Sequence, residues 1–112
     1  MRDKDRLEHF ELLVLLALMR VGESAYGVSI AREIEATAKG RPVALASLYL
    51  TLDRLEAHGL VRSELGEPTP ARGGRAKRHF FVTPKGLSKI KATRRALTRM
   101  WSGIPELRGD ET

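Results

Sequence analysis

The side chains that could do chemistry in this chain are few and scattered, except for its cations. The histidines His9, His58 and His79 fall on separate predicted elements, and the sequence has neither an HExxH motif nor a cysteine. Gly73 and Gly74 lack the spacing of a phosphate-binding loop, and no carboxylates cluster as acid–base catalysis requires. Helix capping and packing account for such histidines. We therefore expect no enzyme, no cofactor and no metal site.

The cations, in contrast, are concentrated in one part of the chain. Twenty Lys and Arg residues against fourteen Asp and Glu give a formal net charge of +6. No acid occurs between Glu67 and Glu106, whereas half of the basic residues lie there: Arg72, Arg75, Lys77, Arg78, Lys85, Lys89, Lys91, Arg94, Arg95 and Arg99. Such a segment favours a polyanionic partner. A Gly/Arg-rich loop taken alone is about as often a solvated hairpin tip as a nucleic-acid contact.

Length and hydropathy limit the class of protein. A chain of 112 residues fits one domain with a real core. The absence of cysteine excludes disulfides and thiolate metal sites. The longest apolar run, Leu12–Met19, is too short to span a membrane, and the N-terminus lacks the shape of a signal peptide. We expect a soluble cytoplasmic protein.

Apolar spacing and breaker residues give the order of elements. The predicted order is helix, helix, helix, strand, strand, helix, over Leu7–Val21, Tyr26–Ala38, Ala44–His58, Leu60–Leu65, Arg78–Thr83 and Pro84–Ile104. Gly22 and Gly59 are expected to end the first and third helices, Ser24 to cap the second, and Thr83 with Pro84 to begin the last.

This order predicts a mainly α (α+β) fold, a winged helix-turn-helix with a two-stranded wing and a C-terminal dimerisation helix. We divide the chain into a DNA-binding domain over residues 1–83, a dimerisation helix over 84–106 and a frayed tail over 107–112.

The outer face of the third helix is the expected reading surface. Leu45, Leu48, Leu52 and Leu55 form its buried stripe, which turns small residues outward near its start. A hydroxyl there could bond a base or phosphate, a leucine could touch a thymine methyl, and arginines could bind phosphate or guanine. A tyrosine beside the stripe is expected to pack its ring and could reach phosphate with its hydroxyl. The predicted DNA-binding residues are Ala46, Ser47, Tyr49, Leu50, Arg54, Arg72, Arg75, Lys77 and Arg78.

The last predicted helix is about 30 Å long and would leave an apolar stripe exposed on so small a body. Pairing with a second copy would bury that stripe and place two DNA-reading units on one side, suited to an inverted repeat. The predicted dimer interface is made of Leu7, Phe10, Leu87, Ile90, Leu97, Met100, Trp101 and Ile104.

Three segments carry a resemblance to a known family: LLVLLALMRVGESAYGVSIAREIE, ASLYLTLDRLEAHGLV and GEPTPARGGRAKRHFFVTPKG. They resemble the PadR family of winged-helix transcriptional regulators, over Leu7 to Ile104, in its short form with one C-terminal helix. The resemblance implies a homodimeric DNA-binding repressor whose third helices enter successive major grooves of an inverted repeat. In some short members a tryptophan of the last helix lines an apolar pocket between subunits, which implies an apolar small-molecule effector near Trp101. A packing anchor is the commoner role for such a tryptophan.

An RNA-binding or protein-interaction winged helix is the alternative. Charge alone does not distinguish RNA phosphates from DNA phosphates. The family resemblance favours double-stranded DNA.

Overall fold

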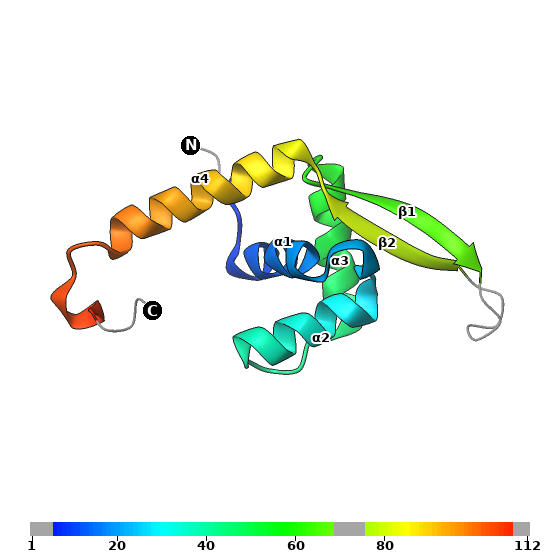
Figure 1. The fold of residues 1–112 in the computed structure, drawn as a ribbon, viewed down its shortest axis with the longest axis horizontal. Coiled ribbons are helices and arrows are strands. Elements are labelled where there is room, and N and C mark those ends of the chain that lie inside the picture. Colours follow the sequence, from blue (N-terminus) through cyan, green and yellow to red (C-terminus); the bar gives the residue numbers. More distant parts are fainter. Residues whose placement is uncertain (1–5, 69–75, 109–112) are drawn as a thin grey trace.

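The structure, a computed structural model, describes residues 6–68 and 76–108. Its elements follow the predicted order (Figure 1), namely α1 (His9–Val21), η2 (Gly22–Ser24), α2 (Gly27–Ala38), α3 (Leu45–Ala57), β1 (Val61–Pro68), β2 (Ala76–Val82), α4 (Pro84–Trp101) and η4 (Pro105–Leu107). Within the described ranges, no helix has the length and apolar character to cross a membrane.

The core lies where α1, α2 and α3 meet the base of the β-hairpin. Leu48, Leu52 and Leu55 are fully buried, as their spacing predicts, and Phe80 of β2 is 1% exposed among them. Leu45 continues the same spacing but is 42% exposed, because it begins the helix beyond the edge of this core. Burying these large apolar side chains supplies most of the driving force that holds the helices together.

Glycines end the helices as predicted, but one cap differs. Gly22 and Gly59 take positive φ values of 72° and 76°, the conformation that glycine adopts most readily. Ser24 does not cap α2. Instead Ser29 accepts a hydrogen bond from the Tyr26 N–H at 3.0 Å and donates to the Ser24 carbonyl at 2.6 Å. Ser29 lies inside the first turn, where its hydroxyl reaches back to the chain before the helix.

The two strands pair antiparallel and are longer than predicted. The register places Val61 opposite Val82 and Leu65 opposite Arg78, and an irregularity follows Leu65. Pairing continues across this irregularity to Pro68 and Ala76. The hairpin and α4 project in opposite directions from the helical body (Figure 1), which gives a length of 55 Å against a smallest dimension of 21 Å.

The end of α3 is fastened to the start of α4 through three consecutive carbonyls. The His58 carbonyl accepts from Lys85 Nζ at 3.0 Å. The Gly59 carbonyl accepts from the Thr83 hydroxyl at 2.6 Å, and the Leu60 carbonyl accepts from the Thr83 N–H at 3.1 Å. Thr83 also caps α4, as predicted, by accepting from the Gly86 N–H at 3.0 Å.

Only the first half of α4 packs on the body. Gly86 and Ile90 are buried, whereas the later apolar residues Leu97, Met100 and Trp101 are 41%, 76% and 52% exposed. The helix ends at Trp101 instead of the predicted Ile104, because Gly103 takes a φ of 80° and turns the chain into η4. The end of the segment predicted as helix, residues 84–106, is thus a turn followed by η4, and of the predicted tail residues 109–112 lie outside the described residues.

Candidate nucleic-acid interface

Helices α2 and α3 form a helix-turn-helix, in which α3 takes the place of the recognition helix, the one that enters a major groove. The buried leucines of α3 turn Ala46, Ser47 and Leu50 to solvent at its N-terminal half, and Leu50 is 63% exposed. None of these three side chains is charged. The small side chains allow a close approach to another surface, and their hydroxyl and methyl groups suit direct contacts with base edges.

Tyr49 has mainly a packing role in the free protein. Its ring lies 6.4 Å from the Phe80 ring, tilted by 51°. Its hydroxyl fits against Gly27 so closely that a Cβ at Gly27 would overlap it. The side chain is still 39% exposed, so its outer edge remains accessible to a bound partner. The packing expected of this ring is therefore confirmed.

Arg54 is directed by neighbouring polar groups. Its Nη2 donates to the Thr51 hydroxyl at 3.3 Å, and its Nε lies 3.8 Å from a Glu11 carboxylate oxygen on α1. The Arg54 side chain is 52% exposed, which leaves the outer edge of the guanidinium open to an anion. The partner Glu11 was not foreseen from the sequence, because the two residues are far apart along the chain.

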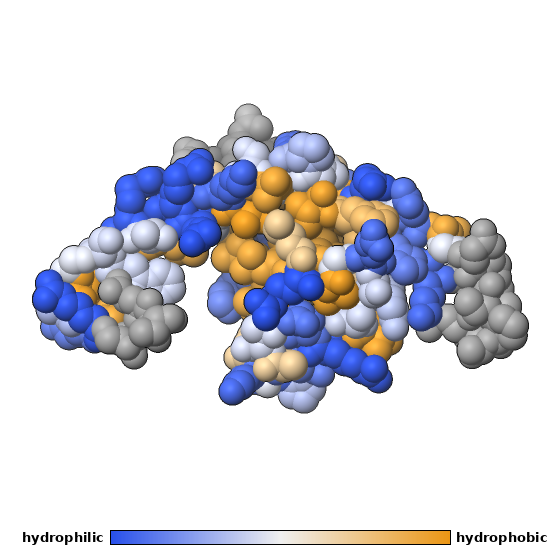
Figure 2. Space-filling model, viewed as in Figure 1, coloured by the Kyte–Doolittle hydropathy of each residue, from blue (hydrophilic) through white to orange (hydrophobic). Residues whose placement is uncertain are grey.

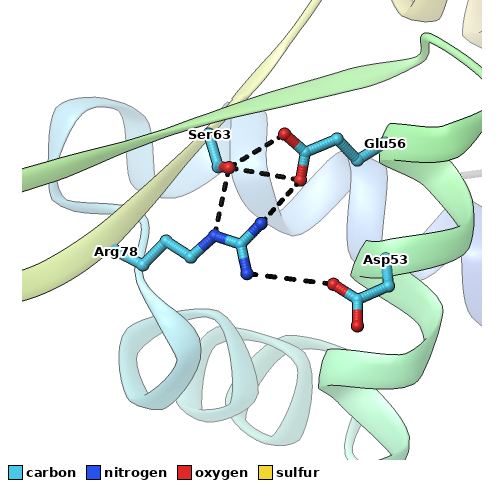
Figure 3. Close-up of polar contacts among 4 residues, drawn as sticks. All are labelled: Asp53, Glu56, Ser63 and Arg78. Carbon is cyan, nitrogen blue, oxygen red and sulfur yellow. Dashed lines mark hydrogen bonds and ion pairs between the residues drawn. The ribbon is translucent and has the colours of Figure 1, made fainter.

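Arg78 does not extend toward the tip of the hairpin but turns to α3 (Figure 3). Its Nη2 donates to Glu56 at 2.9 Å, its Nε donates to the Ser63 hydroxyl at 3.1 Å, and its Nη1 lies 3.9 Å from Asp53. Ser63 in turn donates to Glu56, with an oxygen–oxygen distance of 2.9 Å. The sequence pattern alone does not indicate Glu56, Ser63 and Asp53 as partners of Arg78. We call these four residues the Arg78 cluster.

The opposite face of β2 contacts the start of α2. The Lys77 ammonium lies 4.1 Å from the centroid of the Tyr26 ring, a cation–π contact. His79 places Nδ1 3.1 Å from the Glu23 carbonyl. Lys77 is thus the described wing cation nearest to the tip, while the predicted DNA-binding residues Arg72 and Arg75 lie outside the described residues.

A second surface lies between α1 and α4. Figure 2 shows hydrophobic residues gathered at the centre of one face, over α1 and beneath α4. A pocket of about 230 Å³ opens there, lined by Leu12, Leu16, Ile90, Arg94, Leu97, Thr98 and Trp101. Of the predicted interface residues, Ile90 is 7% exposed and belongs to the chain's own core, against which Leu7 and Phe10 are partly buried. These three residues already have partners within one chain, whereas the distal residues of α4 are largely uncovered.

The comparisons with known proteins agree with this architecture. The model of the transcriptional regulator PadR-like family matches residues 14–92, which run from α1 into α4. No match was found among curated proteins.

Similar solved structures include a transcriptional regulator from Clostridium thermocellum, 25% identical, with a TM-score of 0.66 over 80% of this chain and 81% of that one. A PadR family transcriptional regulator from Eggerthella lenta is 26% identical, with a TM-score of 0.65 over 85% and 80% of the two chains. A PadR family regulator from Clostridium difficile, at 20% identity and a TM-score of 0.67 over 83% and 91%, shares the fold.

Proposed function

The chain belongs to the PadR-like family of transcriptional regulators, and on that basis we propose that it is a homodimeric repressor that binds an inverted-repeat operator. Family members are regulators of transcription and not enzymes. The observation that carries the proposal is the neutral outward face of α3, where Ala46, Ser47 and Leu50 stand exposed beside a projecting hairpin. A buried leucine stripe directly behind this face holds it in place.

Direct contacts with bases are assigned to Ser47 and Leu50, with Ala46 allowing the close approach of the backbone. Arg54 presents the exposed edge of its guanidinium to phosphate or guanine at the next turn of α3. In the wing, Arg72, Arg75 and Lys77 bind phosphates or an adjacent minor groove. Tyr49 contributes at most its outer edge, since its ring packs on Phe80.

The projecting half of α4 supports a second copy as partner. Leu97, Met100, Trp101 and Ile104 are each at least 40% exposed, and α1 adds Leu16 and Met19 at 39% and 50%. Apolar side chains gathered in this way are usually covered by a partner. A two-fold pair buries the same patch on each copy. Pairing through the segment over residues 84–106, most of which is α4, then brings two DNA-binding units over residues 1–83 together. The two linked copies of α3 then bind a palindromic site far more tightly than a single copy does.

An apolar effector would enter beside Trp101. The pocket between α1 and α4 offers about 230 Å³ and a lining of mainly apolar side chains. It adjoins the face assigned to the second copy, so a molecule bound there would change how the two subunits meet. Loss of operator binding on titration with small aromatic compounds, together with quenching of the fluorescence of the single tryptophan, would support this site.

The proposal is tested by selecting duplexes from a random pool with the wild-type chain. Recovered sites should contain an inverted repeat with half-sites about one helical turn apart, and should compete better than random duplex above about 100 mM salt. Placing the site over a promoter should then reduce transcription in a run-off assay. Structured RNA that competes as well as the selected duplex would favour the RNA-binding alternative. Sedimentation showing only monomers at micromolar concentration would contradict the dimer.

A further inference from the structure

We infer that Arg78 is a positioning residue that sets the angle between the hairpin and α3 and does not itself bind DNA. The inference rests on the proposed function, because the angle matters only if α3 and the hairpin read one duplex together. It removes one cation from the predicted DNA-binding set and adds Glu56 and Ser63 to the residues on which specific binding depends.

The geometry of the Arg78 cluster joins three elements through one guanidinium. Arg78 is on β2, Ser63 is on β1, and Glu56 with Asp53 lies on the side of α3 that faces the hairpin (Figure 3). The Glu56 carboxylate accepts from Arg78 at 2.9 Å and from Ser63 at 2.9 Å, so a single acid holds both strands. A planar guanidinium used on three of its nitrogens fixes direction as well as distance.

Electrostatics argue against a phosphate at the same place. One guanidinium stands between two carboxylates, with Glu56 at 2.9 Å and Asp53 at 3.9 Å, so the cluster carries a net negative charge. A phosphate brought to Arg78 would meet both acids at close range, and like charges repel. The guanidinium also lies 5.2 Å from the centroid of the Phe80 ring, which fixes its inner side against the core.

Arg78 lies on β2 where the hairpin leaves the core, so its contacts set the direction of the hairpin. Phe80 is anchored in the core and its N–H donates to the Ala25 carbonyl at 2.9 Å. Arg78 is the next residue outward on the same face of the strand. Leu65, its partner in the register, is already 75% exposed, and the strands continue to Pro68 and Ala76. A small change of angle at Arg78 therefore displaces Pro68 and Ala76, at the far end of the paired strands, by more than it displaces Arg78 itself.

A charge-removal cycle tests the inference with the full chain and the duplex that the wild type selects. Glu56→Gln and Arg78→Gln should each weaken binding about three- to tenfold, the range of a half-exposed hydrogen-bonded ion pair. The double variant should bind the duplex no more weakly than the weaker-binding of the two single variants, because both changes break the same contact between β2 and α3. Arg78→Lys should recover part of the loss. The dependence of affinity on salt should keep its wild-type slope in all of them.

Arg62→Gln is the matched control. Arg62 is also a hairpin arginine, but its contacts, with Glu64 at 2.6 Å and with the Phe81 ring at 4.4 Å, lie within the hairpin and do not reach α3, so its loss should leave binding within about twofold.

A phosphate contact by Arg78 predicts the opposite sign for one variant. Glu56→Gln would then free the guanidinium and tighten binding, and Arg78→Gln would lower the salt slope by about one. Either result overturns the inference while leaving the proposed function intact. A wild-type chain that selects no duplex would overturn the proposed function instead.

A second measurement needs no DNA. The chain has no cysteine, so spin labels can be placed at Ala57→Cys on α3 and Leu65→Cys on β1, both exposed positions, and diluted with unlabelled chain. The distance distribution should be narrow in this background and in Arg62→Gln, and broader in Glu56→Gln and Arg78→Gln. Equal widths in all four would contradict the positioning role. Thermal unfolding of each variant separates this effect from a general loss of structure.

Discussion

Glu11 of α1 and Arg54 of α3 form an ion pair across two packed helices, with 3.8 Å between Arg54 Nε and a Glu11 carboxylate oxygen. The other Glu11 oxygen accepts the Glu8 N–H at 2.8 Å and so closes the first turn of α1. Glu11 is only 8% exposed. Because a carboxylate in such a place must be satisfied by partners, the start of α1 and a predicted DNA-binding residue depend on the same side chain.

Glu11→Ala should therefore lower the free energy of unfolding by about 1–2 kcal/mol, since it removes a helix cap and a largely buried ion-pair partner. Arg54→Ala should cost less than about 1 kcal/mol, because its side chain is half exposed. Urea unfolding measures both. Glu23→Ala, an exposed acid in η2, is the control; equal stability of the Glu11 and Glu23 variants would refute the prediction.

Gly86→Ala should destabilise the fold by about 1–3 kcal/mol through overpacking. A Cβ there would overlap the Leu60 carbonyl oxygen and lie 2.9 Å from Val82 Cγ1, at the point where α4 crosses the start of β1. The backbone carbonyl cannot move aside cheaply. Gly40→Ala is the matched change, since a Cβ at Gly40 would meet nothing within 4 Å. Thermal unfolding should separate the two variants clearly.

Trp101→Glu should convert the proposed dimer to monomers in sedimentation velocity experiments at micromolar concentration. A charge in the middle of an apolar interface loses its hydration without gaining a partner. Operator affinity should fall by about a hundredfold, because the α3 helices of two subunits are then no longer linked in one dimer. Ala92→Glu puts the same charge on an exposed position of α4 and should leave the dimer intact. A dimer that persists in Trp101→Glu would place the interface elsewhere.

Wing and recognition-helix variants should differ in kind. Lys77→Ala and Arg75→Ala should weaken binding to every duplex and reduce the salt slope by about one for each lost phosphate contact. Ser47→Ala and Leu50→Ala should instead change which duplex is preferred, by about 1–3 kcal/mol at a contacted base pair. Repeating the selection with each variant and titrating salt gives both quantities. Uniform losses in both groups would contradict this division.

The stability of the fold around α2 should depend on pH through the Glu33 carboxyl. A hydrogen bond from the Thr37 hydroxyl at 2.6 Å, and a second from Arg20 Nε at 2.8 Å, lower the pKa of the Glu33 carboxyl below its ordinary value. The charged form is thus favoured in the folded state, so its contribution to stability is present above the ordinary glutamate pKa and disappears as the pH falls through the lowered one. Thr37→Val should raise the Glu33 pKa in an NMR titration, while Thr93→Val on α4 should leave it unchanged.

Local pattern was sufficient to predict most of the fold. The leucine spacing of α3, the glycines at positions 22 and 59, and the Thr83 cap all act within a few residues, and each was predicted from the sequence. One wrong prediction, the residue that caps α2, also concerns a local feature. Ser24 and Ser29 both stand near the start of α2, and the choice between them depends on the turn formed by η2, which spacing does not specify.

Partners across the chain were not predictable in the same way. Arg78 and Glu56 are separated by 22 positions, and many charged residues at that separation could have paired. Their pairing follows from the strand register that sets Arg78 opposite Leu65 and turns it to α3. Ile90 likewise joins the core of its own chain because α4 begins flush against Leu60, a contact that the apolar stripe of α4 does not encode.

Three consecutive carbonyls at the end of α3 fix the position of the start of α4. The carbonyls of His58, Gly59 and Leu60 hold Thr83 and Lys85 at the start of α4. The helix is about 27 Å long, at 1.5 Å of rise per residue over eighteen residues, and only its second half projects from the body. Because α4 runs from Pro84 to Trp101 as one helix, a contact made at Trp101 in the proposed dimer is connected to that junction by regular backbone. We therefore expect that a partner bound at the end of α4 acts on the end of α3, the proposed recognition helix, through this junction.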